Sequence, residues 1–196
     1  MANPGGGGGS PTSHFAVSEF MSKVDGMNSF AKRNRFTVEI TPPTSLTSAT
    51  GVEDVPPENV EFLVKTVSFP SRTFGTTNLR YGGKYSMELP YETTSEGVAL
   101  TFLETNNWNC RKFWYNWLEY IQSVESYNMK YYDDYKGTIK ISVYDESDRE
   151  AVNPKHRVSL INAFPKGMSA IELGWENAEL LDFGVDIIYK KWEIEI

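Results

Sequence analysis

One stretch limits the fold more than any other: residues 107–124, NWNCRKFWYNWLEYIQSV. Its apolar residues recur at three- and four-residue intervals, which is typical of one face of an amphipathic helix. The members of this stripe are Cys110, Phe113, Trp114, Trp117, Leu118, Ile121 and Val124. Asn106, Asn107 and Asn109 are candidate caps for its start, because an Asn side chain accepts hydrogen bonds from free amides of the first turn.

Two tryptophans and a phenylalanine on one stripe need a large apolar surface to pack against. No second helix of comparable length is predicted elsewhere in the chain, so the partner is expected to be a β-sheet. The predicted fold class is therefore mainly β with one flanking α-helix, an α+β arrangement in which the strands form a β-sandwich or β-barrel.

Alternating apolar and polar residues predict most of the strands, and short turns between them favour antiparallel pairing. The expected strands cover residues 35–40, 60–69, 73–79, 84–91, 98–104, 138–144, 157–164 and 180–196. A hairpin is expected within residues 72–91, turning at Tyr81, Gly82 and Gly83. A short amphipathic helix is expected over residues 15–24. Residues 41–59, rich in Pro, Ser and Thr, predict a long loop of the kind that is usually functional or ordered by a partner.

The length and composition predict one domain after a low-complexity arm. The chain has 196 residues, and residues 1–14 include five consecutive glycines. These residues are interpreted as a flexible arm or an expression linker, and residues 15–196 as a single domain. The net charge of −7 disfavours a tight nucleic-acid binder, which usually carries a basic face.

The single cysteine excludes an internal disulfide and favours a reducing compartment. No apolar run reaches the length of about 18 residues that a membrane-spanning helix needs, so no membrane association is expected. The first residues lack the basic and apolar regions of a secretory signal.

The sequence gives little support for a catalytic site. Cys110, at the start of a helix beside Arg111, is a candidate nucleophile, but its place on the apolar stripe favours a buried, inert thiol. The only histidines, His14 and His156, do not have zinc-ligand spacing with it. No catalytic residue, cofactor or metal site is predicted.

Each of two charged clusters could be a ligand-binding site or an ordinary solvated surface. The acidic run that begins at Asp145 lacks the Gly and Glu positions of a calcium-binding loop, because Glu150 and Arg157 stand there. A solvated turn is favoured. The basic run KRNRF, residues 32–36, is suited to a phosphate or an acidic neighbour, although a strand flank held in a salt bridge is favoured.

Four segments together resemble the tail tube proteins of contractile-tailed, myovirus-type bacteriophages, which are related to the tube proteins of type VI secretion and contractile injection systems. They are residues 31–40 (AKRNRFTVEI), residues 67–70 (VSFP), residues 100–117, and residues 158–193. In the third segment a strand leads into a helix that contains Arg-Lys-Phe and Trp. Their order and spacing carry the resemblance over about residues 15–193.

The resemblance implies a structural virion protein with no enzymatic activity. Six subunits would form a ring, and stacked rings would form a hollow tube that conducts DNA into the host. The implied partners are further copies of the chain, the tail sheath protein, the baseplate tube initiator, the tape-measure protein and double-stranded DNA in passing. The implied location is the virion tail, assembled in the host cytoplasm.

The resemblance also suggests roles for individual residues. The polar lumen face is expected to include Lys84, Glu88, Asp182, Asp186 and Lys190. The hairpin tip, Tyr81, Gly82 and Gly83, is expected to contact the next ring.

Other interpretations stay open at this level. The chain would also suit a baseplate tube initiator or an injection-system tube subunit that carries effectors. More remote alternatives are a carbohydrate-binding β-sandwich and an enzyme that uses Cys110.

Overall fold

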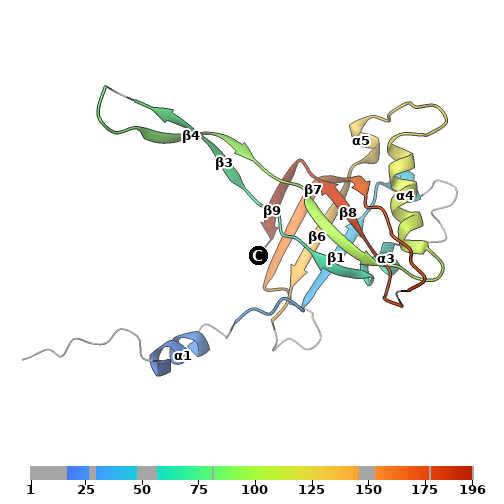
Figure 1. Ribbon diagram of the computed structural model, residues 1–196, viewed down its shortest axis with the longest axis horizontal. Coiled ribbons are helices and arrows are strands. Elements are labelled where there is room, and N and C mark those ends of the chain that lie inside the picture. Colours follow the sequence, from blue (N-terminus) through green and yellow to red (C-terminus); the bar gives the residue numbers. More distant parts are fainter. Residues whose placement is uncertain are drawn as a thin grey trace, which may run out of the picture.

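The computed structural model describes residues 17–26, 30–47, 57–80, 82–145, 153–176 and 178–195. Within them lie nine strands and five helices (Figure 1). The strands are β1 (Phe36–Thr41), β2 (Val64–Val67), β3 (Thr73–Leu79), β4 (Met87–Thr94), β5 (Val98–Leu103), β6 (Gly137–Val143), β7 (His156–Met168), β8 (Asp182–Ile188) and β9 (Lys191–Glu195). The helices are α1 (Val17–Gly26), α2 (Thr44–Thr47), α3 (Pro57–Glu61), α4 (Asn109–Ile121) and α5 (Tyr132–Tyr135).

Two antiparallel sheets share strand β7. Sheet A has the order β1-β6-β7-β9, and sheet B has the order β7-β8-β5-β2. Among the described strands, β3 and β4 pair only with each other. The fold is therefore mainly antiparallel β with few helices, which confirms the predicted class.

Strand β7 can serve both sheets because it changes partners along its length. Its first part, residues 157–161, pairs with both β6 and β9, whereas residues 164–168 pair with β8. Between these parts Asn162 has a φ of 56°, a left-handed conformation that Asn tolerates better than most residues. The register shifts again between Pro165 and Gly167. The bend lets one strand join two sheets around a common core.

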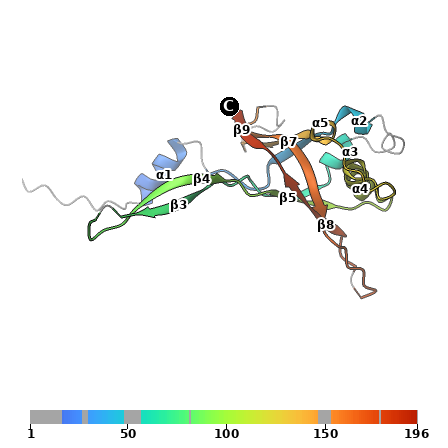
Figure 2. The same ribbon diagram turned by 90° about the horizontal axis from the view of Figure 1, so that it is seen from above.

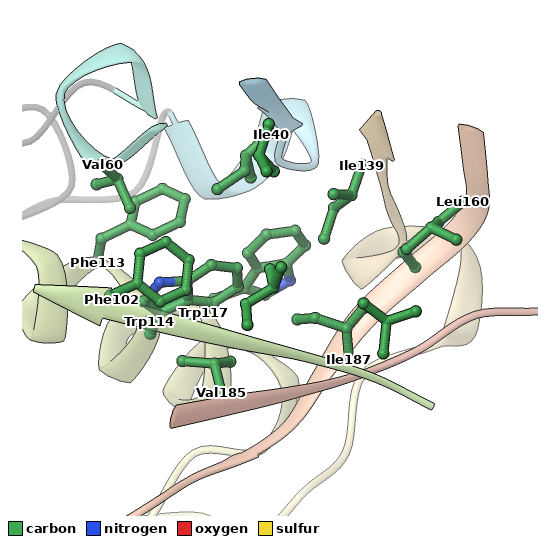
Figure 3. Packing of buried hydrophobic residues seen from close by; sticks show 14 of the residues in the cluster. Ile40, Val60, Phe102, Phe113, Trp114, Trp117, Ile139, Leu160, Val185 and Ile187 are labelled. Atoms are coloured by element: carbon green, nitrogen blue, oxygen red, sulfur yellow. The ribbon is translucent and has the colours of Figure 1, made fainter. Parts of the chain in front are cut away.

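The core lies between the sheets and helix α4 (Figure 3). The indole rings of Trp114 and Trp117 stack with centroids 5.6 Å apart, and Phe102 of β5 approaches Trp114 at 5.3 Å. From the other strands come Ile139, Leu160, Val185 and Ile187, all fully buried. Burying aromatic side chains of this size dominates the energy of such a core.

The helix stripe largely faces this core. Cys110, Phe113, Trp114, Trp117 and Ile121 are buried, and Leu118 is half-buried at the margin. Val124 departs from the expectation, because the helix ends at Ile121 and Val124, lying beyond it, is exposed.

The expected asparagine cap is wrong. Trp108 occupies the cap position with a φ of 59° and makes no side-chain cap hydrogen bond. The carboxylate of Glu104 accepts hydrogen bonds from the amides of Arg111 (2.8 Å) and Cys110 (3.3 Å) instead. A carboxylate here is favoured by the positive end of the helix dipole.

Two expected strands are divided. Residues 60–69 are not one strand: α3 ends at Glu61, and β2 begins only at Val64. Residues 180–196 contain two strands, β8 and β9, with a turn between them at which the Lys190 amide bonds to the Ile161 carbonyl. Within the expected loop 41–59, α2 and the start of α3 are helical, and residues 48–56 lie outside the described residues. The predicted arm, residues 1–14, lies outside them as well.

Candidate assembly surfaces

Cys110 is placed as a structural residue. Its side chain is fully buried, and burial raises the pKa of the thiol, with the Glu104 carboxylate adding to the effect. A nucleophilic cysteine needs the opposite shift. Among the described residues no group of three His, Cys, Asp or Glu side chains is placed to hold a metal ion. No helix in the described part of the chain is long and apolar enough to cross a membrane.

The hairpin β3–β4 projects far from the body of the domain (Figures 1 and 2). It continues the β2–β5 ladder outward, because β3 follows β2 and β4 leads into β5. Its strands and turn expose several large side chains: Phe74, Leu79, Tyr85, Met87 and Tyr91. Exposed apolar side chains grouped on one projection mark an interaction surface.

The predicted turn lies at the hairpin's tip. Gly82 has a φ of 63°, which glycine adopts without steric cost, and exposed Gly83 follows it. Tyr81 lies outside the described residues. The structure thus places Gly82 and Gly83 in the connection between β3 and β4.

The outer edge of β1 is closed. Helix α3 packs against β1, and the Glu61 carboxylate accepts a hydrogen bond of 2.5 Å from the Ile40 amide. Burial, together with repulsion from Glu39 and Glu58, raises the pKa of Glu61, although the Ile40 amide opposes the shift. A strand from another copy would have to displace this carboxylate to pair with β1.

Sheet B differs because both of its edges are open. No strand among the described residues pairs with β2 on the side away from β5, or with residues 164–168 of β7 on the side away from β8. An open strand edge carries unpaired amide and carbonyl groups and is a template for another chain. One subunit thus presents two open strand edges, one at each end of the order β7-β8-β5-β2.

The outward face of sheet B carries polar side chains and charges of both signs. Asp182 and Asp186 alternate with core residues along β8, and Asp182 forms a 2.5 Å ion pair with Lys65 of β2. Lys166 and Asp186 line one shallow pocket on this face. Of the other lumen candidates, Lys84 and Glu88 lie on the hairpin and Lys190 lies in the β8–β9 turn. The five candidates therefore do not form one cluster.

A second projection lies between β7 and β8, and its described residues, 170–176 and 178–181, are here named the acidic finger (Figure 2). Trp175 is fully exposed, and Leu173 and Leu180 are 74% and 81% exposed. Glu172, Glu176 and Glu179 alternate with them along the segment. Sequence reasoning missed this finger because its spacing is neither helical nor strand-like; the only signal is a Trp and leucines interleaved with glutamates.

The basic pocket lies between the start of β1 and the end of β2. Its volume is about 480 Å³. Its residues are Ala31, Lys32, Arg33, Arg35, Phe36, Lys65, Thr66, Val67, Phe69 and Val143. The Arg35 guanidinium donates a hydrogen bond of 2.8 Å to the Asp145 carbonyl. Four residues of the run KRNRF thus line this pocket: Lys32, Arg33, Arg35 and Phe36.

A mostly antiparallel β fold with few helices is the fold of tail tube proteins. The chain belongs to the phage tail tube protein family, whose sequence profile matches residues 31–195. A comparison with curated protein sequences finds no significant match.

Solved structures share this fold at low sequence identity. A chain of the sheath–tube complex of an extracellular contractile injection system, PVC, in the extended state is 14% identical; the alignment covers 89% of this chain and 96% of that chain, with a TM-score of 0.58. A chain of the anti-feeding prophage baseplate is 14% identical over 85% of this chain and 96% of that chain, with a TM-score of 0.59. A chain of the same prophage's tube-terminating cap is 16% identical over 85% and 91%, with a TM-score of 0.57.

Proposed function

We propose that this protein is the subunit of a hollow tail tube, in which six copies form a ring and rings stack into a conduit for DNA. The observation that carries the proposal is that sheet B has two open edges. Membership of the tail tube family supports the same assignment.

In the proposed ring, β2 of one subunit pairs with residues 164–168 of β7 in its neighbour. The two edges lie at opposite ends of the order β7-β8-β5-β2, so the contact is heterologous and closes when the rotation per subunit divides a full turn. Pairing would remove the open edges of every subunit and join the six copies of sheet B into one barrel.

The outward face of sheet B would line the lumen in this arrangement. Lys65 is paired there with Asp182, and Lys166 lies in one pocket with Glu96 and Asp186, so the face would offer DNA phosphates little net attraction. Weak attraction suits passage, since firm phosphate binding depends on an excess of Lys and Arg. The projecting hairpin would then reach the next ring, with Gly82 and Gly83 at its tip.

The side of helix α4 opposite the core would face outward. Tyr115 is 53% exposed there, and this surface is available to a surrounding sheath. The fold shared with a chain of a sheath–tube complex is consistent with that role. The baseplate initiator and the tape-measure protein would meet the ends and the lumen of the same tube.

The first test is negative-stain electron microscopy of the purified chain, with light scattering for mass. Rings and hollow tubes are expected. A chain that stays monomeric at high concentration, and also on added baseplates, would refute the tube assignment. Protein rather than DNA in the lumen of native tubes would favour an injection system instead.

Cross-linking tests the strand contact itself. The only native cysteine is buried, so a Lys65→Cys, Lys166→Cys double variant presents two new thiols on the facing edges. A short thiol cross-linker should give a ladder of species up to the hexamer. The matched control, Glu39→Cys with Lys166→Cys, places one thiol on the closed β1 edge and should give no ladder. Equal ladders from both variants would refute the β2–β7 contact.

A further inference from the structure

Helix α1 carries an apolar stripe and lies apart from the body of the domain (Figures 1 and 2). The stripe repeats at three- and four-residue intervals and consists of Val17, Phe20, Met21 and Val24. Phe30 extends it, because the ring centroids of Phe20 and Phe30 lie 6.3 Å apart. Val17, Met21 and Phe30 are exposed. A helix of ten residues is marginal in water unless its apolar face is packed, so α1 needs a surface to cover this stripe.

The β3–β4 hairpin is a second amphipathic element. Paired residues of two antiparallel strands point to the same face, and so does every second residue along each strand. Leu79 pairs with Met87, and two positions nearer the body Thr77 pairs with Leu89. These four side chains therefore share one face, on which Leu79 and Met87 are exposed.

Tyr91 enlarges this apolar face. Its ring lies on the same side, since a Cβ atom added to Gly75 would be 3.3 Å from Cε1 of Tyr91. The opposite face carries Asn78, which pairs with Glu88. A two-stranded hairpin is marginal in water by itself and is stabilised when a helix packs on its apolar face. The hairpin therefore needs the kind of element that α1 is.

Within one subunit the two elements do not meet. Both are joined to the same end of the body, because Arg33 before β1 and Phe69 after β2 line one pocket. From there they diverge, and Figure 1 shows them on opposite sides of that end. We propose that α1 of one copy packs its stripe on the apolar face of the β3–β4 hairpin in a second copy. This inference rests on the proposed self-assembly and assigns a contact separate from the pairing of β2 with β7.

A second copy is the occupant that satisfies both surfaces at once. Every copy supplies one stripe and one apolar hairpin face, so a contact repeated from copy to copy covers them all. Surfaces on opposite sides of one end are the two halves of such a heterologous contact. Met21 and Met87 lie on the two surfaces, and flexible Met side chains fill irregular gaps between packed elements. The contact would add to the shared tube fold, because the family profile matches residues 31–195 and α1 precedes them.

Thiol cross-linking of two single variants tests the contact in the assembled full chain. Met21→Cys places a thiol on the stripe of α1, and Thr77→Cys places one on the apolar face of the hairpin, while the native cysteine is buried. The two proteins are mixed before assembly and treated with a short thiol cross-linker. Mass spectrometry should identify a peptide that joins residues 21 and 77 of separate chains. The matched control mixes Ser22→Cys with Asn78→Cys, which move each thiol by one residue off the apolar surface, and should give little of the corresponding product.

A charge on the stripe measures how much the contact contributes to assembly. Met21→Asp should raise the critical concentration for assembly about tenfold or more, because it buries a charge in an apolar interface. Ser22→Asp is the matched control and should assemble like the wild type. Both variants introduce Asp into the same turn of α1, so any loss of helix is shared. Equal critical concentrations for the two variants, measured by light scattering, would overturn the proposal.

The outcomes separate this inference from the tube assignment. If the wild type assembles and residues 21 and 77 do not cross-link in the mixture, the contact between α1 and the hairpin is wrong and the tube assignment stands. If a Met21→Cys, Thr77→Cys double variant cross-links within one chain and the mixture does not, α1 covers its own hairpin and the second copy is wrong. A chain that stays monomeric, also on added baseplates, would overturn both.

Discussion

The body of the domain and its two projections use aromatic residues in opposite ways. In the body, Trp114 and Trp117 are completely buried and stack on each other. On the hairpin and the acidic finger, Tyr85 and Trp175 are almost fully exposed. The body therefore stabilises itself within one chain, whereas the projections gain nothing from their apolar groups until another chain covers them. Variants in the body should affect folding, and variants in the projections should affect assembly.

The largest effect on folding is expected for Trp117→Ala. This change removes a fully buried ring that stacks on Trp114 and donates a hydrogen bond of 3.0 Å to the Tyr135 carbonyl. Replacing a buried Trp with Ala costs about 3–5 kcal/mol of unfolding free energy. Chemical denaturation followed by circular dichroism measures the loss. A loss of unfolding free energy below about 1 kcal/mol would mean that the buried aromatic rings contribute little to the stability of the body, against the contrast drawn with the projections.

Gly137→Ala tests how tightly the body packs at one contact, that between Gly137 and Trp117. A Cβ atom here would lie 2.6 Å from the Thr41 carbonyl oxygen and 2.8 Å from Cη2 of Trp117. The expected cost is about 1–3 kcal/mol, since overpacking a tight core forces backbone or rotamer shifts. The control is Gly167→Ala, where a Cβ atom meets nothing within 4 Å. Chemical denaturation of the two variants should give a clearly lower midpoint for Gly137→Ala than for Gly167→Ala. Equal denaturation midpoints would argue against a rigid Trp117 site.

Glu61→Gln tests the closed edge of β1 through pH. The pKa of Glu61 is raised in the folded protein, so folding binds a proton that the unfolded chain has released. Stability therefore falls as pH rises from the ordinary carboxyl pKa, about 4.3, through the raised folded value. Gln still accepts the Ile40 hydrogen bond but has no charge, and it should remove this fall. The effect should stay below about 1 kcal/mol, because solvent screens a half-exposed group. Urea unfolding between pH 4 and 7 measures it, and an unchanged slope would contradict the assignment.

The body and the existence of the hairpin were largely predictable from the sequence, whereas the acidic finger was not. The stripe on α4 predicts its own burial, because an apolar face that wide has to be covered by a sheet. Strand alternation identified β8, where Phe183, Val185 and Ile187 face the core. Local sequence patterns gave wrong predictions where contacts between distant parts of the chain determine the local structure. Glu104 caps α4 from before the helix, and the turn at Lys190 divides the last strand through a bond to β7.

The lumen candidates stay a prediction, and strand alternation alone supports them only in part. Alternation assigns a residue to a face of its own strand, and this was sufficient for Asp182 and Asp186 on β8. It does not say which strands share a sheet, so Glu88 was grouped with them although β4 belongs to the hairpin. The acidic finger has no helical or strand periodicity in its sequence, and its exposure follows only from the folded structure of the body.

The smallest effect on folding is expected for the hairpin, where Tyr85→Ser and Met87→Ser replace side chains that are 86% and 59% exposed. Surface changes of this kind usually alter stability by less than about 0.5 kcal/mol. Assembly should respond strongly, because the same side chains would be buried between rings, and tubes should be lost while the subunit melts normally. Thermal melting and electron microscopy of the same sample give both quantities. A large loss of stability would mean that the hairpin packs on its own body. Normal tubes would mean that these side chains make no contact between copies. The contrast between a body that stabilises the fold and a hairpin that serves assembly would then be wrong for the hairpin.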